Sequence, residues 1–435
     1  MARPMAGHCS NLAWHLANPL KTSLRPRWYN IYISSSNFIF IMNNTVQNQR
    51  ISAVDALRGF AVMGIMLLHN IEHFNYYSFP KTELPWLRSL DSSIWDMMFF
   101  TFSGKAYAIF ALLFGFTFYL QSHHAEQRGE DFKNRYMWRL VLLLGFGFIN
   151  SLFFPGEILV LYAILGFALV PVRRWSNKAL LWTAVILMLQ PVEWGKVIYA
   201  AICPEANPNQ MIYSLGDVYP VLGGASFWAM VKDNFVTGQL ASLNWAWCYG
   251  RVFQTTSLFI FGLLIGRMGL FRSSTEEELN RSRSLWTKVL CYAAPLAIIF
   301  YYGKRFLFAQ IENPFMKASI TTIFNSWYNL FFMLSIVGVF LLLYWTRPTG
   351  LQRWLVPYGK MSLTNYVTQS IIGSFLYFGY GLGLHAKCGI TASFCIGIVF
   401  LVLQVSFAHW WMARHKRGPL ESIWHKLTWM KQKSL

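Results

Sequence analysis

An arginine and a histidine stand at the two ends of an otherwise almost entirely apolar stretch, RGFAVMGIMLLHN, which runs from Arg58 to Asn70. In an α-helix this spacing turns through about 1100°, so Arg58 and His69 share one face to within roughly 20° and lie about 16 Å apart along the axis. A guanidinium can bind a phosphate through two hydrogen bonds, and an imidazole can transfer a proton near neutral pH. The pair therefore suits anion binding at one end of a helix and acid–base chemistry toward the other.

Two more ionisable residues follow His69 within about one turn, in the string HNIEH. His69, Glu72 and His73 lie at i, i+3 and i+4, so a helix would place them on one face. The string matches the H-x-x-E-H pattern of one class of zinc peptidase, but the sequence offers no third ligand, and we expect no metal. Glu72 is better explained as a carboxylate that orients or charges a histidine. His69 and Glu72 are thus the candidate catalytic residues, and His73 is a candidate lining residue.

The composition around these residues is that of a membrane protein. Of the 435 residues, 55% are hydrophobic and 13% are charged, whereas soluble domains carry about 25% charged residues. Apolar runs long enough to cross a hydrocarbon core of about 30 Å recur along the chain. The sequence predicts an all-α, polytopic membrane bundle of about ten transmembrane helices, near residues 56–73, 98–121, 138–154, 157–172, 179–202, 252–270, 285–302, 320–345, 361–384 and 389–412.

The distribution of lysine and arginine predicts how this bundle is oriented and explains the net charge of +19 without a nucleic-acid partner. With the N-terminus inside, most basic residues fall on the inner side, so the positive-inside rule puts both termini in the cytoplasm. Arg58 then lies at the cytoplasmic edge, as an interfacial anchor beside Asp55 or as a ligand contact. His69 lies deep, where an ionisable group is satisfied by a neighbouring helix or faces a cavity.

Three segments differ from the predicted spans. Residues 1–50 contain no convincing signal peptide, and we expect a disordered extension from a misplaced start, with Met42 as the true start. The membrane domain, 51–412, is interrupted by an outer loop, 203–251, that carries an amphipathic interfacial helix. Residues 413–435 predict a basic cytoplasmic tail helix whose apolar side can lie on lipid.

Four further polar residues lie within or beside the predicted spans. Lys105 is either a snorkelling anchor or a ligand contact. Glu157 is either a charge that complements a helix N-terminus or a cavity residue. Asn365 and Gln369 lie one turn apart and form a polar stripe, which interhelical hydrogen bonding or cavity lining would explain.

Several blocks of the chain resemble the YeiB-like family of bacterial inner-membrane proteins, whose C-terminal half has been catalogued as a domain of unknown function. The resemblance covers about residues 50–430 and is carried by DALRGFAVMGIMLLHNIEHF, KAYAIFALLFGFTFYL, GEILVLYAILGFALVP, YGKMSLTNYVTQSIIG and HKRGPLESIWHKLTW, in that order. This family is similar in turn to the transmembrane acyltransferases, which include the enzymes that O-acetylate polysaccharides and the lysosomal heparan glucosaminide acetyltransferase. The arginine, ten intervening residues and histidine in the first span of some of these enzymes resemble Arg58 to His69.

The resemblance implies an acyltransferase of the bacterial inner membrane. The donor would be a cytoplasmic acyl-CoA held by Arg58 and Lys105, and no other cofactor is expected. The acceptor would be a hydroxyl or amine of a cell-envelope glycan or lipid-linked sugar at the outer face, activated by His69 with Glu72. The alternative is a transporter or channel for a small solute, in which the same polar residues line a permeation pathway. Transporters often carry inverted repeats or broken helices in matching halves, and the sequence shows neither.

Overall fold

In the computed structural model, the chain divides by its internal contacts into residues 1–49 and residues 50–435. The structure describes residues 51–72, 74, 76, 79–80, 84–130, 132–205, 207–347 and 349–430. The predicted extension 1–50, with its start at Met42, and His73 lie outside these residues.

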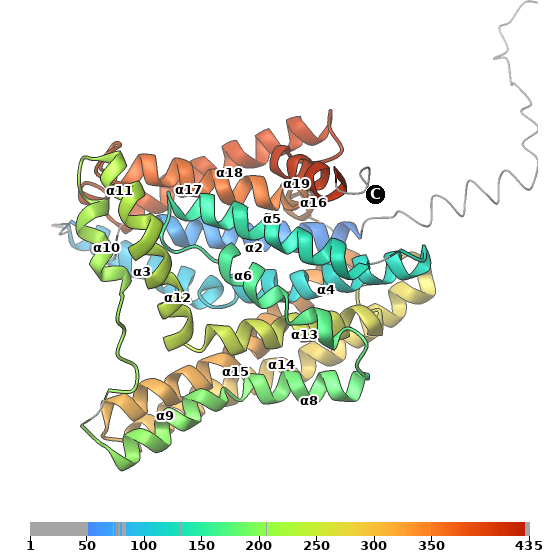
Figure 1. Cartoon of the computed structure of the whole chain (residues 1–435), viewed down its shortest axis with the longest axis horizontal. Coiled ribbons are helices and arrows are strands. Elements are labelled where there is room, and N and C mark those ends of the chain that lie inside the picture. The colour runs from blue at the N-terminus through green and yellow to red at the C-terminus, as the bar shows by residue number, and fades with distance from the viewer. Residues whose placement is uncertain are drawn as a thin grey trace, which may run out of the picture. The chain divides into compact units, whose positions relative to one another are not determined.

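The described part of the second unit, residues 50–435, is built from helices and connecting turns, so the predicted all-α class is confirmed (Figure 1). Its N-terminal half contains α2 (Ser52–Ile71), α3 (Pro85–Phe102), α4 (Ala106–Gln127), α5 (Phe132–Ser151), α6 (Leu159–Gly166), α7 (Leu169–Val172), α8 (Asn177–Met188), α9 (Pro191–Ile202), α10 (Leu215–Leu222), α11 (Phe227–Asp233), the π-helix η1 (Asn234–Gly238) and α12 (Gln239–Cys248). Its C-terminal half contains α13 (Arg251–Met268), α14 (Glu276–Gln310), α15 (Pro314–Thr346), α16 (Gly350–Lys360), α17 (Ser362–Tyr377), the 3₁₀-helix η2 (Leu384–Ala386), α18 (Ile390–Met412) and α19 (Pro419–Met430).

Several of these helices are suited to a membrane. Across the described residues, six helices are long and apolar enough to cross a bilayer, or up to seven if the bent pair Phe227–Cys248 and Arg251–Met268 forms one span. The chain is thus a multi-pass membrane protein. The predicted number of about ten spans stays a prediction, because α6, α7 and α17 contain only 8, 4 and 16 residues.

Helix α2 lies at the centre of the bundle, where it packs against α3, α4, α15, α16, α17 and α18. Its most apolar window is 78% buried, against 17% for α14 and 28% for α18. A helix that is apolar on all sides is stable in such an interior position. Asp55, His69 and Asn70 of α2 are accordingly buried within the protein, whereas most of the apolar window of α14 and of α18 is not.

Close packing between α2 and α16 holds the first turns of α2 in place. A methyl group at Gly59 would collide with the Leu355 carbonyl, and one at Gly359 would collide with the Asp55 carbonyl. Small residues let two membrane helices approach this closely, and side-chain packing then fixes their register. The backbone of Arg58, next to Gly59, is therefore held at a fixed position in the bundle.

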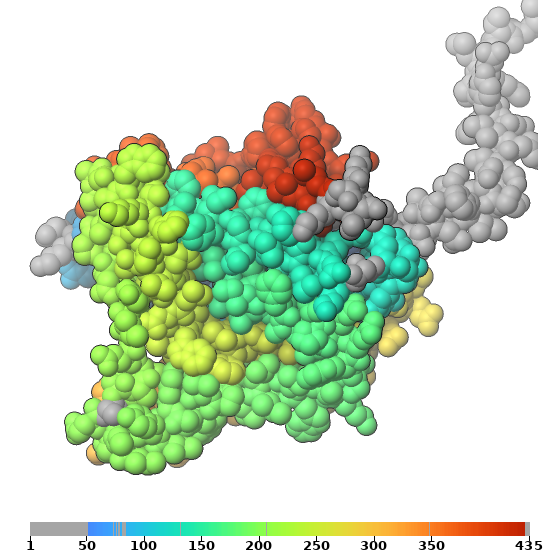
Figure 2. Space-filling model, in the orientation of Figure 1, coloured from blue at the N-terminus to red at the C-terminus, as the bar shows by residue number. Residues whose placement is uncertain are grey.

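The outer-loop segment 203–251 is largely helical and packs on the protein. Met230 of α11 and Val218 of α10 belong to one buried cluster with Phe378 and Phe74. Figure 2 shows the yellow-green segment covering one end of the bundle, opposite the end at which α2 begins. The predicted interfacial helix therefore turns part of its apolar side toward the protein interior, and α12 ends at a bend of 73° before α13.

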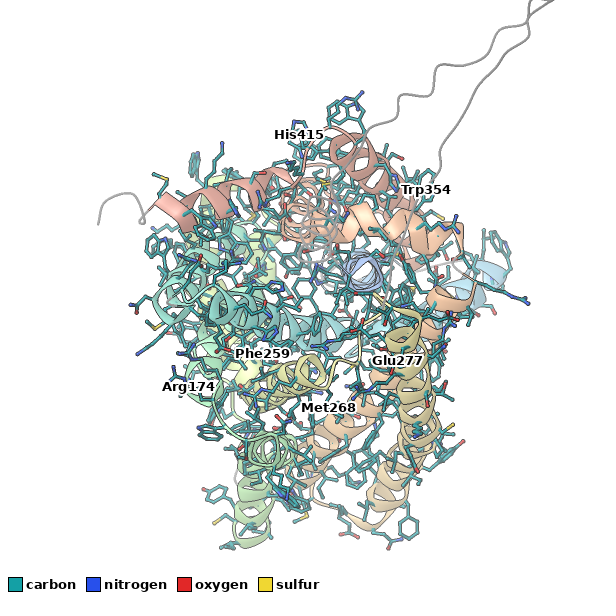
Figure 3. The ribbon with its side chains drawn as sticks, turned by 90° about the vertical axis from the view of Figure 1, so that its right-hand side faces the viewer. Arg174, Phe259, Met268, Glu277, Trp354 and His415 are labelled. Atoms are coloured by element: carbon teal, nitrogen blue, oxygen red, sulfur yellow. The ribbon has the colours of Figure 1, made fainter. Side chains whose placement is uncertain are left out.

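The tail helix α19 also packs on protein. Leu420 and Trp424 contact a buried cluster that includes Leu143 of α5 and Leu363 of α17. Figure 3 views the bundle from the end at which α2 begins, where Arg174, Met268, Glu277, Trp354 and His415 all lie. Leu420 and Trp424 are thus partly buried against protein, and the expectation that the apolar side of the tail can lie on lipid stays a prediction. Ile423 and Met430 of this helix are exposed.

Candidate functional site

Two cavities occupy the interior of the bundle, one toward each end of α2. The outer cavity, of about 470 Å³, is lined by His69, Glu72, Glu157, Arg251 and Tyr366, among others, with walls from α2, α4, α6, α10, α12 and α13. The inner cavity, of about 320 Å³, is lined by Arg58, Arg139, Lys360, Arg417, Glu421 and Tyr366, among others. We call them the outer and inner cavities after the predicted orientation. Tyr366 of α17 lies in the wall of both.

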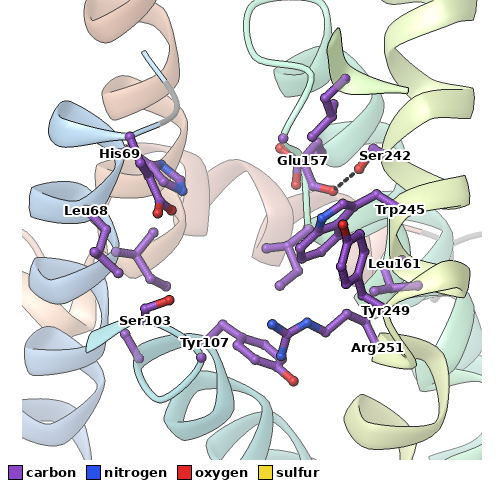
Figure 4. Close-up of a pocket in the computed structure, with 18 of the residues that line it drawn as sticks. Leu68, His69, Ser103, Tyr107, Glu157, Leu161, Ser242, Trp245, Tyr249 and Arg251 are labelled. Atoms are coloured by element: carbon purple, nitrogen blue, oxygen red, sulfur yellow. Dashed lines mark hydrogen bonds between the residues drawn. The ribbon is translucent and has the colours of Figure 1, made fainter. Parts of the chain in front are cut away.

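His69 lies at the end of α2 and borders the outer cavity (Figure 4). Its side chain is enclosed by aromatic rings: the centroid of its imidazole lies 4.8 Å from that of Phe154, 6.0 Å from Phe74 and 6.4 Å from Tyr366. Glu72, at the C-cap of the same helix, is also buried and lines the same cavity. The two predicted catalytic residues are thus brought to one wall of one cavity.

Glu157 lies on the turn that precedes α6 and lines the outer cavity from another side. Its carboxylate accepts hydrogen bonds from the Asn150 amide and from the backbone N–H of Leu159. Its backbone carbonyl accepts a hydrogen bond from the Ser242 hydroxyl, with an O···O distance of 3.0 Å, drawn in Figure 4. Both predicted roles therefore coincide in this residue, because the carboxylate caps the start of a helix and also borders the cavity.

Arg58 lies at the other end of α2 and borders the inner cavity. One Nη donates a hydrogen bond to Asp55, with an N···O distance of 2.8 Å, and the other donates to the Thr117 hydroxyl, at 3.3 Å. The predicted partner Asp55 is therefore present. Arg58 thus borders the cavity while the ion pair anchors its guanidinium, and its role as a ligand contact stays a prediction.

The inner cavity is strongly basic and is partly formed by the tail helix. The guanidinium of Arg139 on α5 stacks on the Trp424 ring of α19 at 4.3 Å. A smaller basic cavity adjoins it, shares Arg139 and His425 with it, and adds Arg128 and Arg135. Several arginines around one partly open space form a site that suits phosphate groups.

Glu421 is the one carboxylate in the lining of the inner cavity. It accepts hydrogen bonds from the backbone N–H groups of Leu363 and Thr364, at 2.8 and 3.1 Å, and from the Thr364 hydroxyl, at 2.6 Å. These groups lie in the first turn of α17, so Glu421 caps that helix from α19. Burial raises the pKa of the Glu421 carboxyl above its ordinary value, although these hydrogen bonds oppose the shift.

Three other predicted residues border neither cavity. The Lys105 ammonium lies over the rings of Tyr328 and Phe332, at 5.0 and 5.2 Å, and donates a hydrogen bond to the Phe99 carbonyl. This arrangement favours the anchor over the ligand contact, because the charge is turned toward α15.

Asn365 and Gln369 belong to an interhelical hydrogen-bond network. Gln369 donates to the Tyr358 hydroxyl on α16 and to Gln404 on α18, while the Asn365 amide donates to the Tyr358 carbonyl. Gln404 in turn donates to the Asn365 carbonyl and to the Thr368 hydroxyl. The polar stripe on α17 thus connects three helices, as the hydrogen-bonding alternative predicts.

The sequence analysis did not single out Arg139, Arg251, Arg417 or Tyr366. Arg251 directly precedes an apolar span, so the argument used for Arg58 would have selected it. Arg417 stands inside one of the blocks that carry the family resemblance. Tyr366 carries no signal in sequence, because its importance comes from its place between two cavities.

The residues that the structure describes contain no set of metal ligands. No group of three or more His, Cys, Asp or Glu side chains there could hold a metal ion. His73, the second histidine of the H-x-x-E-H string, lies outside the described residues.

Within the described residues, the helices define a multi-pass, all-helical membrane protein with two partly open cavities along its central helix. Residues 266–431 match the family described as "Protein of unknown function (DUF418)". The chain is 27% identical over 410 residues to the uncharacterised protein YxaH of Bacillus subtilis (strain 168), with 89% of this chain and 96% of the relative covered. It is 26% identical to an uncharacterised 39.9 kDa protein in the amylase 3′ region of Bacillus acidopullulyticus, with the same coverage.

A third relative is the uncharacterised protein YeiB of Escherichia coli (strain K12), which is 23% identical, with 87% of this chain and 96% of the relative covered. The predicted resemblance to a YeiB-like family of unknown function is therefore confirmed. The relation to acyltransferases stays a prediction.

Proposed function

We propose that the protein is an integral-membrane acyltransferase, which moves an acyl group from acyl-CoA to a hydroxyl or amine, with acetyl as the first acyl group to test. The observation that carries this proposal is the pair of cavities that meet at Tyr366. One is lined by cations that suit the phosphates of a coenzyme, and the other contains a histidine and two glutamates. A donor and an acceptor that enter from opposite ends of the bundle could meet between them.

The basic residues would hold the donor. Arg58, Arg139, Lys360 and Arg417 line one partly open cavity, and guanidinium groups bind phosphate oxygens bidentately. The adjoining basic cavity extends this space toward the end of the bundle that we predict to be cytoplasmic. The bacterial inner membrane is the location that fits a cytoplasmic donor and a cell-envelope acceptor, such as a glycan or a lipid-linked sugar.

His69 would act as the general base. It takes the proton from the acceptor hydroxyl or amine, whose oxygen or nitrogen attacks the thioester carbonyl carbon. The new acyl–oxygen or acyl–nitrogen bond forms as the acyl–sulfur bond breaks, and the imidazolium returns the proton to the departing thiolate. Glu72, on the same cavity wall, stabilises the imidazolium charge that appears during this cycle.

Turnover separates this proposal from the transport alternative. Purified protein is incubated with acetyl-CoA labelled in the acyl group and a mixture of cell-envelope glycans, and the labelled product and free CoA are measured. We expect both to appear in wild-type protein and to be lost in His69→Gln. Counterflow of a solute through liposomes that contain the protein, without any thioester cleavage, would favour the transporter.

A further inference from the structure

Arg251 is a cation in the outer cavity that the mechanism above does not use. It is the first residue of α13, directly after the bend that follows α12. Its guanidinium carbon lies 4.7 Å from the centroid of the Tyr107 ring and 5.4 Å from that of Trp245. In Figure 4 it extends into the cavity beside Tyr107, at the opposite end from His69 and Glu157.

The hydrogen bonds of this guanidinium are incomplete. One Nη donates to the Gln254 amide oxygen at 2.8 Å, and that oxygen also accepts a hydrogen bond from the Tyr107 hydroxyl. The Nε atom is buried and has no hydrogen-bond partner within the described residues. No carboxylate in the described part of the chain lies within ion-pair distance of Arg251.

An arginine in such surroundings is suited to bind an anion. A buried donor that lacks a partner costs free energy, and a charge removed from water costs more unless it is paired. The two aromatic rings hold the guanidinium plane through cation–π contacts, which leave its edge available for hydrogen bonds. A carboxylate or phosphate that enters the cavity would supply the missing acceptor and the missing charge.

We propose that Arg251 is the recognition residue for a carboxylate or phosphate group on the small molecule that occupies the outer cavity. This inference depends on the proposed function in one respect only, which is that it takes this molecule to be the acyl acceptor. Glu72 and Glu157 line the same cavity and would repel the anionic group. The acceptor is thereby oriented with its anionic group at Arg251 and its hydroxyl or amine toward His69.

The test measures binding without any acyl donor, so that it does not depend on turnover. Detergent-purified full-length protein is titrated with glucuronate, glucose 1-phosphate and neutral glucose. The variants are Arg251→Gln, Arg251→Lys and, as a control, Arg305→Gln, a change at an exposed arginine of α14 that lines neither cavity. Thermal unfolding of each variant, without ligand, reports whether it is folded.

We expect wild-type protein to bind at least one of the two anionic sugars about 10- to 100-fold more tightly than glucose. Arg251→Gln should lose this preference, Arg251→Lys should keep part of it, and Arg305→Gln should keep all of it. Preference for glucuronate alone would identify a carboxylate, and preference for glucose 1-phosphate alone would identify a phosphate. Equal binding of charged and neutral sugars by wild type, no binding of either anion, or a preference unchanged in a folded Arg251→Gln protein would overturn the inference.

Discussion

The ring of Tyr366 lies 6.4 Å from the ring of His69, measured between centroids, and the same tyrosine lines both interior cavities. Tyr366 is itself buried. It therefore forms part of the partition between a basic space and the space that contains the candidate base. In the proposed reaction the acyl group must pass this partition while water is kept from the thioester.

Replacing Tyr366 by alanine should weaken this partition. The lost ring leaves a gap between the cavities, so water from the outer cavity gains access to the thioester. We expect the ratio of acetyl-CoA hydrolysis to acyl transfer to rise several-fold in Tyr366→Ala. Tyr366→Phe keeps the ring and should behave like wild type. An unchanged ratio in the alanine variant would show that Tyr366 does not separate the two spaces.

Glu421 should make the stability of the protein depend on pH. Burial raises the pKa of this carboxyl above its ordinary value of 4.5, so the folded state binds the proton more tightly than the unfolded state. The stabilisation is complete below the unfolded pKa and is lost as the pH rises through the folded pKa. We expect the thermal midpoint of wild type to fall as the pH rises from 4.5, and Glu421→Gln to show a weaker fall. Parallel profiles for the two proteins would contradict this role.

Gln369 should matter for stability and not for ligand binding. Gln369→Leu removes its hydrogen bonds to Tyr358 and Gln404 in the network that connects α16, α17 and α18. Interhelical hydrogen bonds in membrane proteins contribute about 0.6 to 1.7 kcal/mol, so the thermal midpoint should fall by a few degrees. Acetyl-CoA affinity should stay within about twofold of wild type. A large loss of affinity in folded protein would support the cavity-lining alternative.

The elements of the bundle were predictable where hydrophobicity alone defines them. The span predicted at 56–73 corresponds to α2, at Ser52–Ile71, and that at 389–412 corresponds to α18, at Ile390–Met412. The span predicted at 157–172 is divided into α6 and α7. The apolar run gives no sign of this break. Whether a short helix is stable inside the bundle depends on the neighbouring helices that pack around it.

The candidate site was predictable only along α2. Helical periodicity places Arg58, His69 and Glu72 relative to one another, and the structure puts them on the walls of two cavities. Helical periodicity cannot show that Arg139 and Tyr366, which come from helices far apart in the sequence, complete those walls. The sequence also left open whether Lys105 is an anchor or a ligand contact. In the structure its ammonium lies over the rings of Tyr328 and Phe332.

The central claim is that Arg58 binds the acyl donor while His69 transfers the proton. One titration tests it most directly. Detergent-purified wild type, Arg58→Ala and His69→Ala are titrated with acetyl-CoA, and both binding and slow thioester hydrolysis are measured. Arg58→Ala should bind at least about tenfold more weakly. His69→Ala should bind as wild type does and lose about 10²- to 10⁴-fold in turnover. Failure of wild type to bind acetyl-CoA, or full turnover by His69→Ala, would contradict the account.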